Sequence, residues 1–249
     1  MRTTSFAVVS ALFVSCAHAL LPPTNGQETR AAARVYTTCT KPKTLAITFD
    51  DGPNTYTKTI VDTLDKAGGK ATFFFNGKNY NCIYDATNAE RAKYAYDHGH
   101  QVASHTWAHL HLPTLSVAQI TTNDAIKKIT GAAPAFVRPP FGEHNANVQN
   151  VAESLGQSLV TWDLDSQDWN GASVSQIEST YKTRIDSNPN GILTLNHEVY
   201  PGSAQQVLPW VINYAKSKGY KLVTVAECVG AQPYISKGSP STRDSSWVC

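Results

Sequence analysis

The sequence lacks a long run of charge of one sign and any apolar stretch of membrane-spanning length. It has 21 basic and 19 acidic residues, a net charge of +2, and thus no electrostatic footprint for nucleic acid or an anionic membrane. No segment reaches the roughly 20 apolar residues that a membrane helix needs. It also lacks the Asn-x-Ser/Thr acceptor of N-glycosylation. We therefore expect neither nucleic acid nor a membrane as a partner.

The composition is typical of a globular protein. Hydrophobic residues make up 41% of the 249-residue chain and charged residues 16%, which is enough apolar material for a sizeable core and argues against a disordered or fibrous protein. The length allows one large domain or two small ones. About 250 residues is also a typical size for a single α/β barrel.

The N-terminus has the pattern of an export signal. Arg2 supplies a positive start, residues 6–16 form a mostly apolar run, and Ala17-His18-Ala19 has the small-x-small form of a cleavage site. We therefore predict a signal peptide at 1–19 and a protein secreted to the extracellular space or cell wall. Residues 20–42 contain prolines and a basic patch and are expected to form an arm or a propeptide.

Removal of the signal would also remove Cys16 and leave an even number of cysteines. The four that remain are Cys39, Cys82, Cys228 and Cys249, and an even count in an exported chain predicts two disulfides. Three pairings are possible. We favour Cys39 with Cys228 and Cys82 with Cys249, because the first bond would tie the start of the core to its end.

From Lys43 onward, short apolar or β-branched runs alternate with helical patterns, which is typical of βαβ units. The expected strands are 44–49, 71–75, 101–104, 135–138, 158–163, 191–196 and 220–225, and the expected helices are 58–67, 118–129, 146–155, 174–185 and 207–215. About seven units without a linker predict one parallel α/β domain at 43–229, either a barrel or an open doubly wound sheet. The tail 230–249 is rich in Ser, Gly and Pro and is expected to be loop-like.

Unusual polar residues follow these expected strands. They are Asp50 and Asp51 after the first strand, His105 after the third, Arg138 after the fourth, Asp165 and Asp168 after the fifth, and His197 after the sixth. In α/β barrels and open α/β sheets, sites are built at this carboxyl end of the strands. We therefore expect these side chains to share one site.

His105 and His109 have the i, i+4 spacing that brings two imidazoles together on one helical turn. A carboxylate would complete the three protein ligands of a catalytic metal. Alone, the spacing also fits two surface or core histidines. Thr106 stands where zinc proteases of the His-Glu-x-x-His type have their Glu, so that class is excluded.

Asp50 and Asp51 are adjacent at a strand end, where successive side chains point in different directions. One could bind a metal while the other reaches the attacking water. An Asp-Gly turn would also explain the pair. A glycosidase needs two carboxylates about 5–9 Å apart on opposite sides of the scissile bond. Neighbours on one strand provide this poorly, although Asp50 with Asp165 or Asp168 could.

Five motifs, in order, resemble those of the polysaccharide deacetylases, also called NodB-homology or carbohydrate esterase family 4 enzymes. They are Thr48-Phe49-Asp50-Asp51-Gly52-Pro53, His105-Thr106-Trp107-Ala108-His109, Arg138-Pro139-Pro140-Phe141-Gly142, Asp165-Ser166-Gln167-Asp168-Trp169 and Leu195-Asn196-His197. The resemblance spans about Lys43 to Cys228 and is greatest to the secreted fungal chitin deacetylases. It implies a single-domain, distorted barrel of about seven parallel strands.

The resemblance implies a metal and a base. Asp51, His105 and His109 would hold a divalent cation, zinc first and cobalt as an alternative, and two imidazoles with a carboxylate suit such ions. Asp50 would be the general base that takes a proton from the attacking water. Arg138 would pair with Asp50 and keep it ionised.

The other matching positions imply an acid and an oxyanion donor. The backbone N–H of Phe141 would meet the charge that develops on the acetyl oxygen. His197 would donate a proton to the departing amine, and Asp168 would hold His197 protonated and oriented.

The resemblance also implies the substrate contacts, which are Trp169, Leu195 and Pro140. Two positions depart from the family pattern. Phe141 stands where many members have Tyr, and Glu198 follows His197 where Asp is usual. The first change costs little if only the backbone N–H is used, whereas the second alters the surroundings of the acid.

The implied activity is metal-dependent hydrolysis of N-acetyl groups of N-acetylglucosamine residues in chitin or its oligomers, giving chitosan and acetate. The protein is expected to act as a monomer. Peptidoglycan N-acetylglucosamine deacetylase and acetylxylan esterase are alternatives within the same chemistry. A non-catalytic chitin-binding protein is an alternative of another class, but every residue that the chemistry needs is present, which favours an enzyme.

Overall fold

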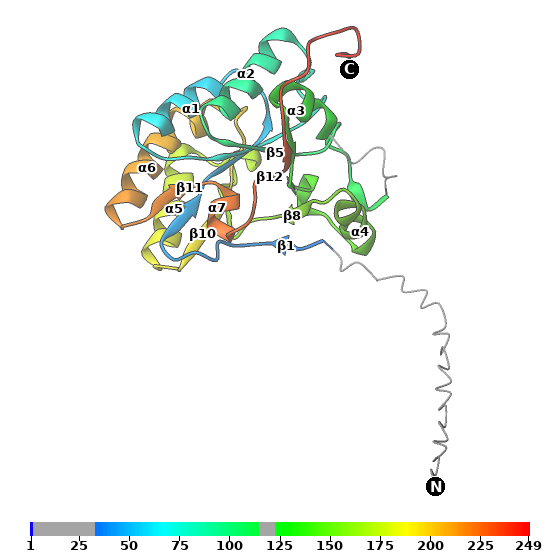
Figure 1. Ribbon diagram of the computed structural model, residues 1–249. Helices are drawn as coiled ribbons and strands as arrows, with labels where there is room; N and C mark the ends of the chain where they lie inside the picture. Colours follow the sequence, from blue (N-terminus) through cyan, green and yellow to red (C-terminus); the bar gives the residue numbers. More distant parts are fainter. Residues whose placement is uncertain (2–32, 115–122) are drawn as a thin grey trace. The chain divides into compact units, whose positions relative to one another are not determined.

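The structure is a computed structural model that describes residue 1 and residues 33–114 and 123–249 (Figure 1). Nearly all of the predicted signal peptide, the first part of the predicted arm and the start of the helix predicted at 118–129 lie outside the described residues. None of the helices in the described ranges is long and apolar enough to cross a membrane.

Among the described residues, ten parallel strands form two sheets. The six-stranded sheet has the order β1 (Val35–Tyr36), β8 (Ser158–Val160), β7 (Phe136–Val137), β5 (Gln101–Ser104), β4 (Thr72–Phe75) and β3 (Thr48–Gly52). The four-stranded sheet has the order β11 (Lys221–Val223), β2 (Thr44–Ala46), β10 (Gly191–Leu195) and β9 (Leu164–Asp165). Within both sheets every pair is parallel.

Backbone hydrogen bonds join β3, at the edge of the first sheet, to the segment that follows β10 of the second. The Asp50 N–H donates to the Asn196 carbonyl (2.9 Å), and the Glu198 N–H donates to the Asp50 carbonyl (3.1 Å). A parallel bridge pairs Asp50 with His197. The expected barrel-like arrangement of parallel strands is confirmed, and the open doubly wound sheet is not the solution that the chain adopts.

Seven helices in the described residues pack around the strands. They are α1 (Thr57–Lys66), α2 (Ala86–Asp97), α3 (Asn123–Thr130), α4 (Ala146–Ser154), α5 (Val174–Asp186), α6 (Leu208–Ser217) and α7 (Val225–Val229). In α1, Ile60, Val61 and Leu64 form the buried stripe expected of an amphipathic helix. Because helices cover the sheet, strands such as β4 are buried on both faces. Figure 1 shows α1, α2 and α6 along one side of the strands.

Two expected strands are each divided in the structure. The run 44–49 forms β2 in one sheet and β3 in the other, and the run 158–163 ends as β8 before β9 begins at Leu164. A continuous apolar run gives no sign of the point where the backbone leaves one sheet for the other. The patterns also failed to predict α2, because its buried face is made largely of alanines rather than of large apolar residues.

Both ends of the described chain are more ordered than expected. β1 lies in the predicted arm and pairs with β8. Within the predicted loop-like tail, β12 (Tyr234–Lys237) pairs antiparallel with β6 (Ala132–Pro134). These short edge strands lack the alternation of apolar and polar residues that marks a longer strand, and so the sequence pattern does not reveal them.

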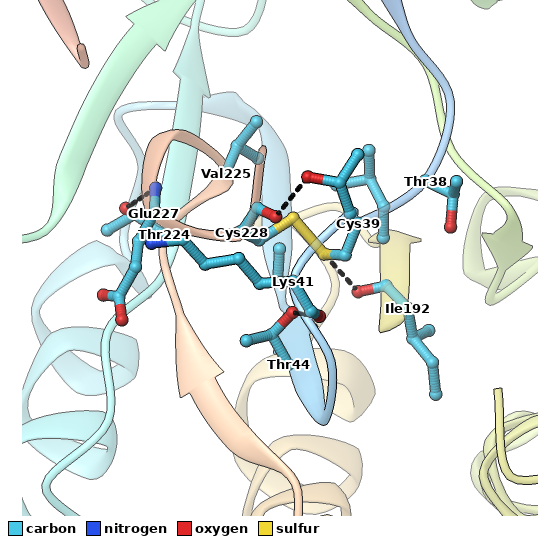
Figure 2. The surroundings of a disulfide bond; sticks show 12 residues. Thr38, Cys39, Lys41, Thr44, Ile192, Thr224, Val225, Glu227 and Cys228 are labelled. Atoms are coloured by element: carbon cyan, nitrogen blue, oxygen red, sulfur yellow. Dashed lines mark hydrogen bonds between the residues drawn. A yellow bond between two sulfur atoms is a disulfide. The ribbon is translucent and has the colours of Figure 1, made fainter. Parts of the chain in front are cut away.

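The two disulfides have the favoured pairing, Cys39–Cys228 and Cys82–Cys249. Figure 2 shows the first bond between α7 and the segment that leads into β2. Both of its cysteines are buried, and the Lys41 N–H donates to the Cys228 carbonyl (3.0 Å). The bond therefore fastens the start of the barrel to its last helix.

Replacing both Cys39 and Cys228 by Ala is expected to lower the free energy of unfolding by about 2–5 kcal/mol, because the cross-link restricts the unfolded chain. The Cys82→Ala/Cys249→Ala protein is the matched comparison, since the two bonds span similar separations of 189 and 167 residues. The first pair is buried whereas Cys249 is exposed, so the first variant should lose more. Denaturant unfolding measures both, and a smaller loss for the first variant would contradict the prediction.

Candidate active site

One cavity of about 230 Å³ lies at the carboxyl ends of the strands. Its lining residues are Asp50, Asp51, His105, His109, Pro139, Phe141, Trp162, Trp169, Leu195, His197 and Tyr200. The polar residues at the carboxyl end of β3 and directly after β5 and β10 thus converge, as the rim position predicts. The site is built where the two sheets meet.

Asp51, His105 and His109 offer three ligand atoms that all lie within 4.8 Å of one another. Asp51 Oδ1 is 3.8 Å from His105 Nε2 and 3.6 Å from His109 Nε2. His105 Nδ1 is 2.8 Å from the Arg138 carbonyl and donates to it, which leaves Nε2 free as a ligand atom. Burial lowers the pKa of His105 to about 3, so the imidazole is neutral. This donor set fits a divalent transition metal.

The backbone between the two histidines differs from the expected helical turn. Residues 105–109 form an irregular loop in which Thr106 and His109 have φ values of 69° and 52°. The rings meet nevertheless, with centroids 4.9 Å apart. The i, i+4 spacing predicted that the two imidazoles meet, but a tight loop rather than a helical turn brings them together.

Asp50 and Arg138 form a buried ion pair beside these ligands. Arg138 Nη1 donates to Asp50 Oδ1 at 2.8 Å, and both side chains are almost fully enclosed. The same guanidinium donates to Thr48 Oγ1 (2.6 Å) and to the Thr161 carbonyl (3.0 Å). Burial raises the pKa of Asp50, and the Arg138 charge opposes that rise. The pair fixes one carboxylate oxygen, while Asp50 Oδ2 lies 3.6 Å from His105 Nε2.

His197 faces this group and is held by Asp168. His197 Nδ1 lies 2.7 Å from Asp168 Oδ1, and the His197 N–H donates to Asp168 Oδ2 at 2.8 Å. The Ser203 hydroxyl also donates to Asp168 Oδ2 (2.7 Å). Burial alone would lower the pKa of His197, but the hydrogen bond and charge of Asp168 outweigh it and raise the pKa to about 9. His197 is therefore an imidazolium at neutral pH, with Asp168 as its counter-ion.

The cavity walls are largely apolar. Leu195 is buried, whereas Trp169 is 52% exposed and donates through Nε1 to Asp165 Oδ1 (3.2 Å). Pro139, rather than the expected Pro140, lines the cavity, because Pro140 lies in the buried start of a 3₁₀ turn, Pro140–Gly142.

Phe141 lies in that 3₁₀ turn in a left-handed conformation, with φ 59°. Its ring stacks on His111 at 4.2 Å and meets the edge of His109. A non-glycine residue with positive φ is costly and is typical of functional sites. The aromatic contacts hold the turn, and with it the Phe141 backbone, at the wall of the cavity.

A family profile described as polysaccharide deacetylase matches residues 37–160. A chitin deacetylase of Pestalotiopsis sp. is 36% identical over 203 residues, which cover 79% of this chain and 67% of that protein. A chitin deacetylase of Colletotrichum lindemuthianum is 33% identical over 78% of this chain and 83% of its own length. The chain belongs to the polysaccharide deacetylase family.

The similarity extends to three dimensions. The solved structure of the Colletotrichum lindemuthianum chitin deacetylase superposes with a TM-score of 0.76 at 32% identity, covering 82% of this chain and 94% of that one. The polysaccharide deacetylase fold and the resemblance noted from the five motifs are therefore confirmed. The five motifs contain every lining residue of the cavity except Trp162 and Tyr200.

Several residues of this polysaccharide deacetylase site did not follow from the motifs. Trp162 and Tyr200 line the cavity, Ser203 bonds to Asp168, and Asn79 Nδ2 donates to Asp51 Oδ1 (3.0 Å). Trp162 follows a strand, which is a usable signal for a rim position. Asn79 lies in a loop and Ser203 in the π-helical turn Ser203–Val207, and neither carries such a signal.

Glu198, which replaces the Asp usual in the family, is fully buried. Its Oε1 accepts a hydrogen bond from the Thr57 hydroxyl (2.6 Å) at the start of α1, whereas Oε2 has no hydrogen-bond partner among the described residues. A Cβ atom on Gly52 would lie 2.3 Å from the Glu198 carboxyl carbon, so the longer side chain requires glycine there. Burial raises the pKa of Glu198 to about 8.

Glu198→Gln is expected to become increasingly more stable than the parent protein as pH rises. The folded-state pKa of about 8 exceeds the ordinary value of 4.5, so the folded protein binds more protons and its unfolding free energy falls between these two pH values. Gln cannot ionise, so the substitution removes this dependence of the unfolding free energy on pH. Urea unfolding at several pH values measures it, with Glu227→Gln, an exposed site, as the control. A pH-independent difference would refute the prediction.

Proposed function

We propose that the protein is a metal-dependent deacetylase of N-acetylglucosamine residues in chitin or chitooligosaccharides, yielding glucosamine units and acetate. The observation that carries this proposal is the meeting, in one cavity, of an Asp-His-His donor set, a buried carboxylate and a carboxylate-paired histidine. The names of the relatives, chitin deacetylase, support the substrate class.

The proposed metal ligands are Asp51, His105 and His109. Zinc is the first candidate and cobalt the second, because neutral imidazoles with one carboxylate suit both. When bound, such a cation supplies Lewis-acid polarisation of the acetyl oxygen and lowers the pKa of water at the site. The neutral state of His105 leaves its lone pair available for this role.

Asp50 is the proposed general base. Its Oδ1 is occupied by Arg138 at 2.8 Å, which leaves Oδ2 directed at the metal ligands to take a proton from the attacking water. A pKa raised by burial makes this carboxylate a stronger base than an exposed one. Arg138 thus orients the base and keeps it ionised.

His197 is the proposed general acid, and Phe141 the proposed oxyanion donor. The amine formed when the C–N bond breaks is a poor leaving group unless it receives a proton, and His197 Nε2 can give one because Asp168 keeps the ring protonated. The Phe141 backbone N–H is assigned to the acetyl oxygen. Leu195 and Trp169 would enclose the acetyl methyl, with Pro139 in the place expected for Pro140.

The proposed setting is the extracellular space or cell wall, with the protein acting as a monomer. The signal-like N-terminus and the two disulfides support export, since such bonds persist in oxidising compartments. A polymeric substrate outside the cell is consistent with a cavity on one face of the molecule that a sugar chain can reach.

Asp50→Asn should lower kcat for acetate release from N-acetylglucosamine oligomers by about 100-fold or more, because it removes the base.

Chelation should abolish release by the parent protein, and added zinc or cobalt should restore it. Acetylated xylan and peptidoglycan are parallel substrates. Binding to chitin should survive the substitution; binding without acetate release by the metal-loaded parent would instead favour the non-catalytic chitin-binding protein.

The rate of deacetylation should fall at alkaline pH as His197 loses its proton, since its pKa is raised to about 9. Asp168→Asn removes the counter-ion and should move this alkaline limb to lower pH by about 1 unit or more. A bound cation repels the imidazolium and lowers the His197 pKa in both the parent and the Asp168→Asn protein. The difference between the two pKa values is preserved. Profiles of kcat/KM against pH test this. Coinciding alkaline limbs would exclude Asp168 as the group that sets the His197 pKa.

A further inference from the structure

The proposed metal ligands lie on strained backbone: Asp51 is at an irregularity near the end of β3, and His105 and His109 are in the loop after β5. Asp51, Thr106 and His109 all have positive φ values, of 69°, 69° and 52°. Such conformations are costly for non-glycine residues and persist only where surrounding contacts hold them. The contacts that hold these two segments therefore decide whether the three ligand atoms stay together.

Asn76 links the end of β3 to the loop after β5. It follows β4, which lies between those strands, and its side chain is buried. The Asn76 N–H donates to the Gly52 carbonyl (2.9 Å) next to Asp51. Asn76 Nδ2 donates to the carbonyls of His105 (2.5 Å) and Thr106 (3.2 Å). One residue thus holds the backbone on both sides of the proposed metal, through its backbone N–H on the Asp51 side and through its side chain on the histidine side.

Asn79 extends this link to the carboxylate itself. Its Nδ2 donates to Asp51 Oδ1 (3.0 Å) and to Asn76 Oδ1 (3.3 Å). Asp51 Oδ1 is also the oxygen that faces the imidazoles of His105 and His109. A carboxylate oxygen has two lone pairs, so the amide can hold one while the other remains directed at the histidines.

The segment that carries Asn79 is itself anchored. The Lys78 N–H donates to the Trp107 carbonyl (2.6 Å), and a Cβ on Gly77 would lie 2.0 Å from the Trp107 ring, so the chain packs closely against the histidine loop. The Cys82–Cys249 disulfide fastens its far end. Asn79 is therefore presented from a fixed segment although its own side chain is exposed.

We propose that Asn76 and Asn79 form an amide bridge that positions the metal ligands, with Asn79 orienting the Asp51 carboxylate. This inference rests on the proposed function, because it requires a metal at Asp51, His105 and His109. Hydrogen bonds to ligating carboxylates typically contribute a factor of 10–100 to metal affinity. Neither amide contacts the reacting atoms, and so both are positioning residues.

Asn79→Ala in the full chain tests the bridge. Zinc affinity is measured by competition with a chromophoric chelator, and the visible spectrum of the cobalt form reports ligand geometry. We expect the zinc Kd to rise about 10–100-fold and the cobalt spectrum to change. With saturating zinc, KM for N-acetylglucosamine oligomers should stay close to that of the parent, because Asn79 is assigned to the metal rather than to the sugar.

Asn150→Ala, an exposed position on α4, is the matched control and should leave zinc affinity unchanged. Asn76→Ala should weaken zinc binding as well, and circular dichroism shows whether this buried variant has folded. An unchanged zinc Kd and cobalt spectrum for Asn79→Ala would overturn the bridge alone. Failure of the parent protein to bind zinc or cobalt would overturn both the bridge and the proposed function.

Discussion

The pairing of one residue, Asp50, with the segment after β10 is the constraint on which the site depends. Its N–H and carbonyl bond to Asn196 and Glu198 across the seam between the two sheets. The same pairing places His197 opposite Asp50. Because backbone hydrogen bonds fix register, the proposed base and the proposed acid are set face to face by the closure of the barrel. The backbone pairing that closes the barrel therefore also sets the geometry of the site.

Closing the seam also buries the Asp50 carboxylate, which requires a counter-ion. Arg138 supplies it and at the same time donates to Thr48 in β3 and to the Thr194 carbonyl in β10, across the seam. It also donates to the carbonyl of Thr161, which follows β8. Breaking a buried ion pair by removing one partner costs about 3–5 kcal/mol. Arg138 is therefore as much a part of the sheet junction as of the site, and its loss would affect stability and activity together.

The sequence was sufficient to predict reactive side chains that stand at the ends of strands. It was not sufficient where the backbone conformation or a single side-chain contact decides the arrangement. Strand-end placement of Asp51, His105 and His197 follows from the βαβ pattern and needs no knowledge of side-chain contacts. The 105–109 loop was expected to be helical because spacing gives no information about positive φ. Asn79 was missed because an asparagine in a loop is normally a turn residue, and only its contact with Asp51 distinguishes it.

The site places two carboxylates in environments that give them opposite tasks. Asp168 receives three hydrogen bonds, from the ring and backbone of His197 and from Ser203, and these outweigh burial and lower its pKa. It is therefore a permanent anion that keeps His197 protonated. Asp50 has its pKa raised by burial and has one oxygen free of Arg138. The proposed base can thus accept a proton while the proposed acid already holds one before substrate arrives, as hydrolysis of an amide requires.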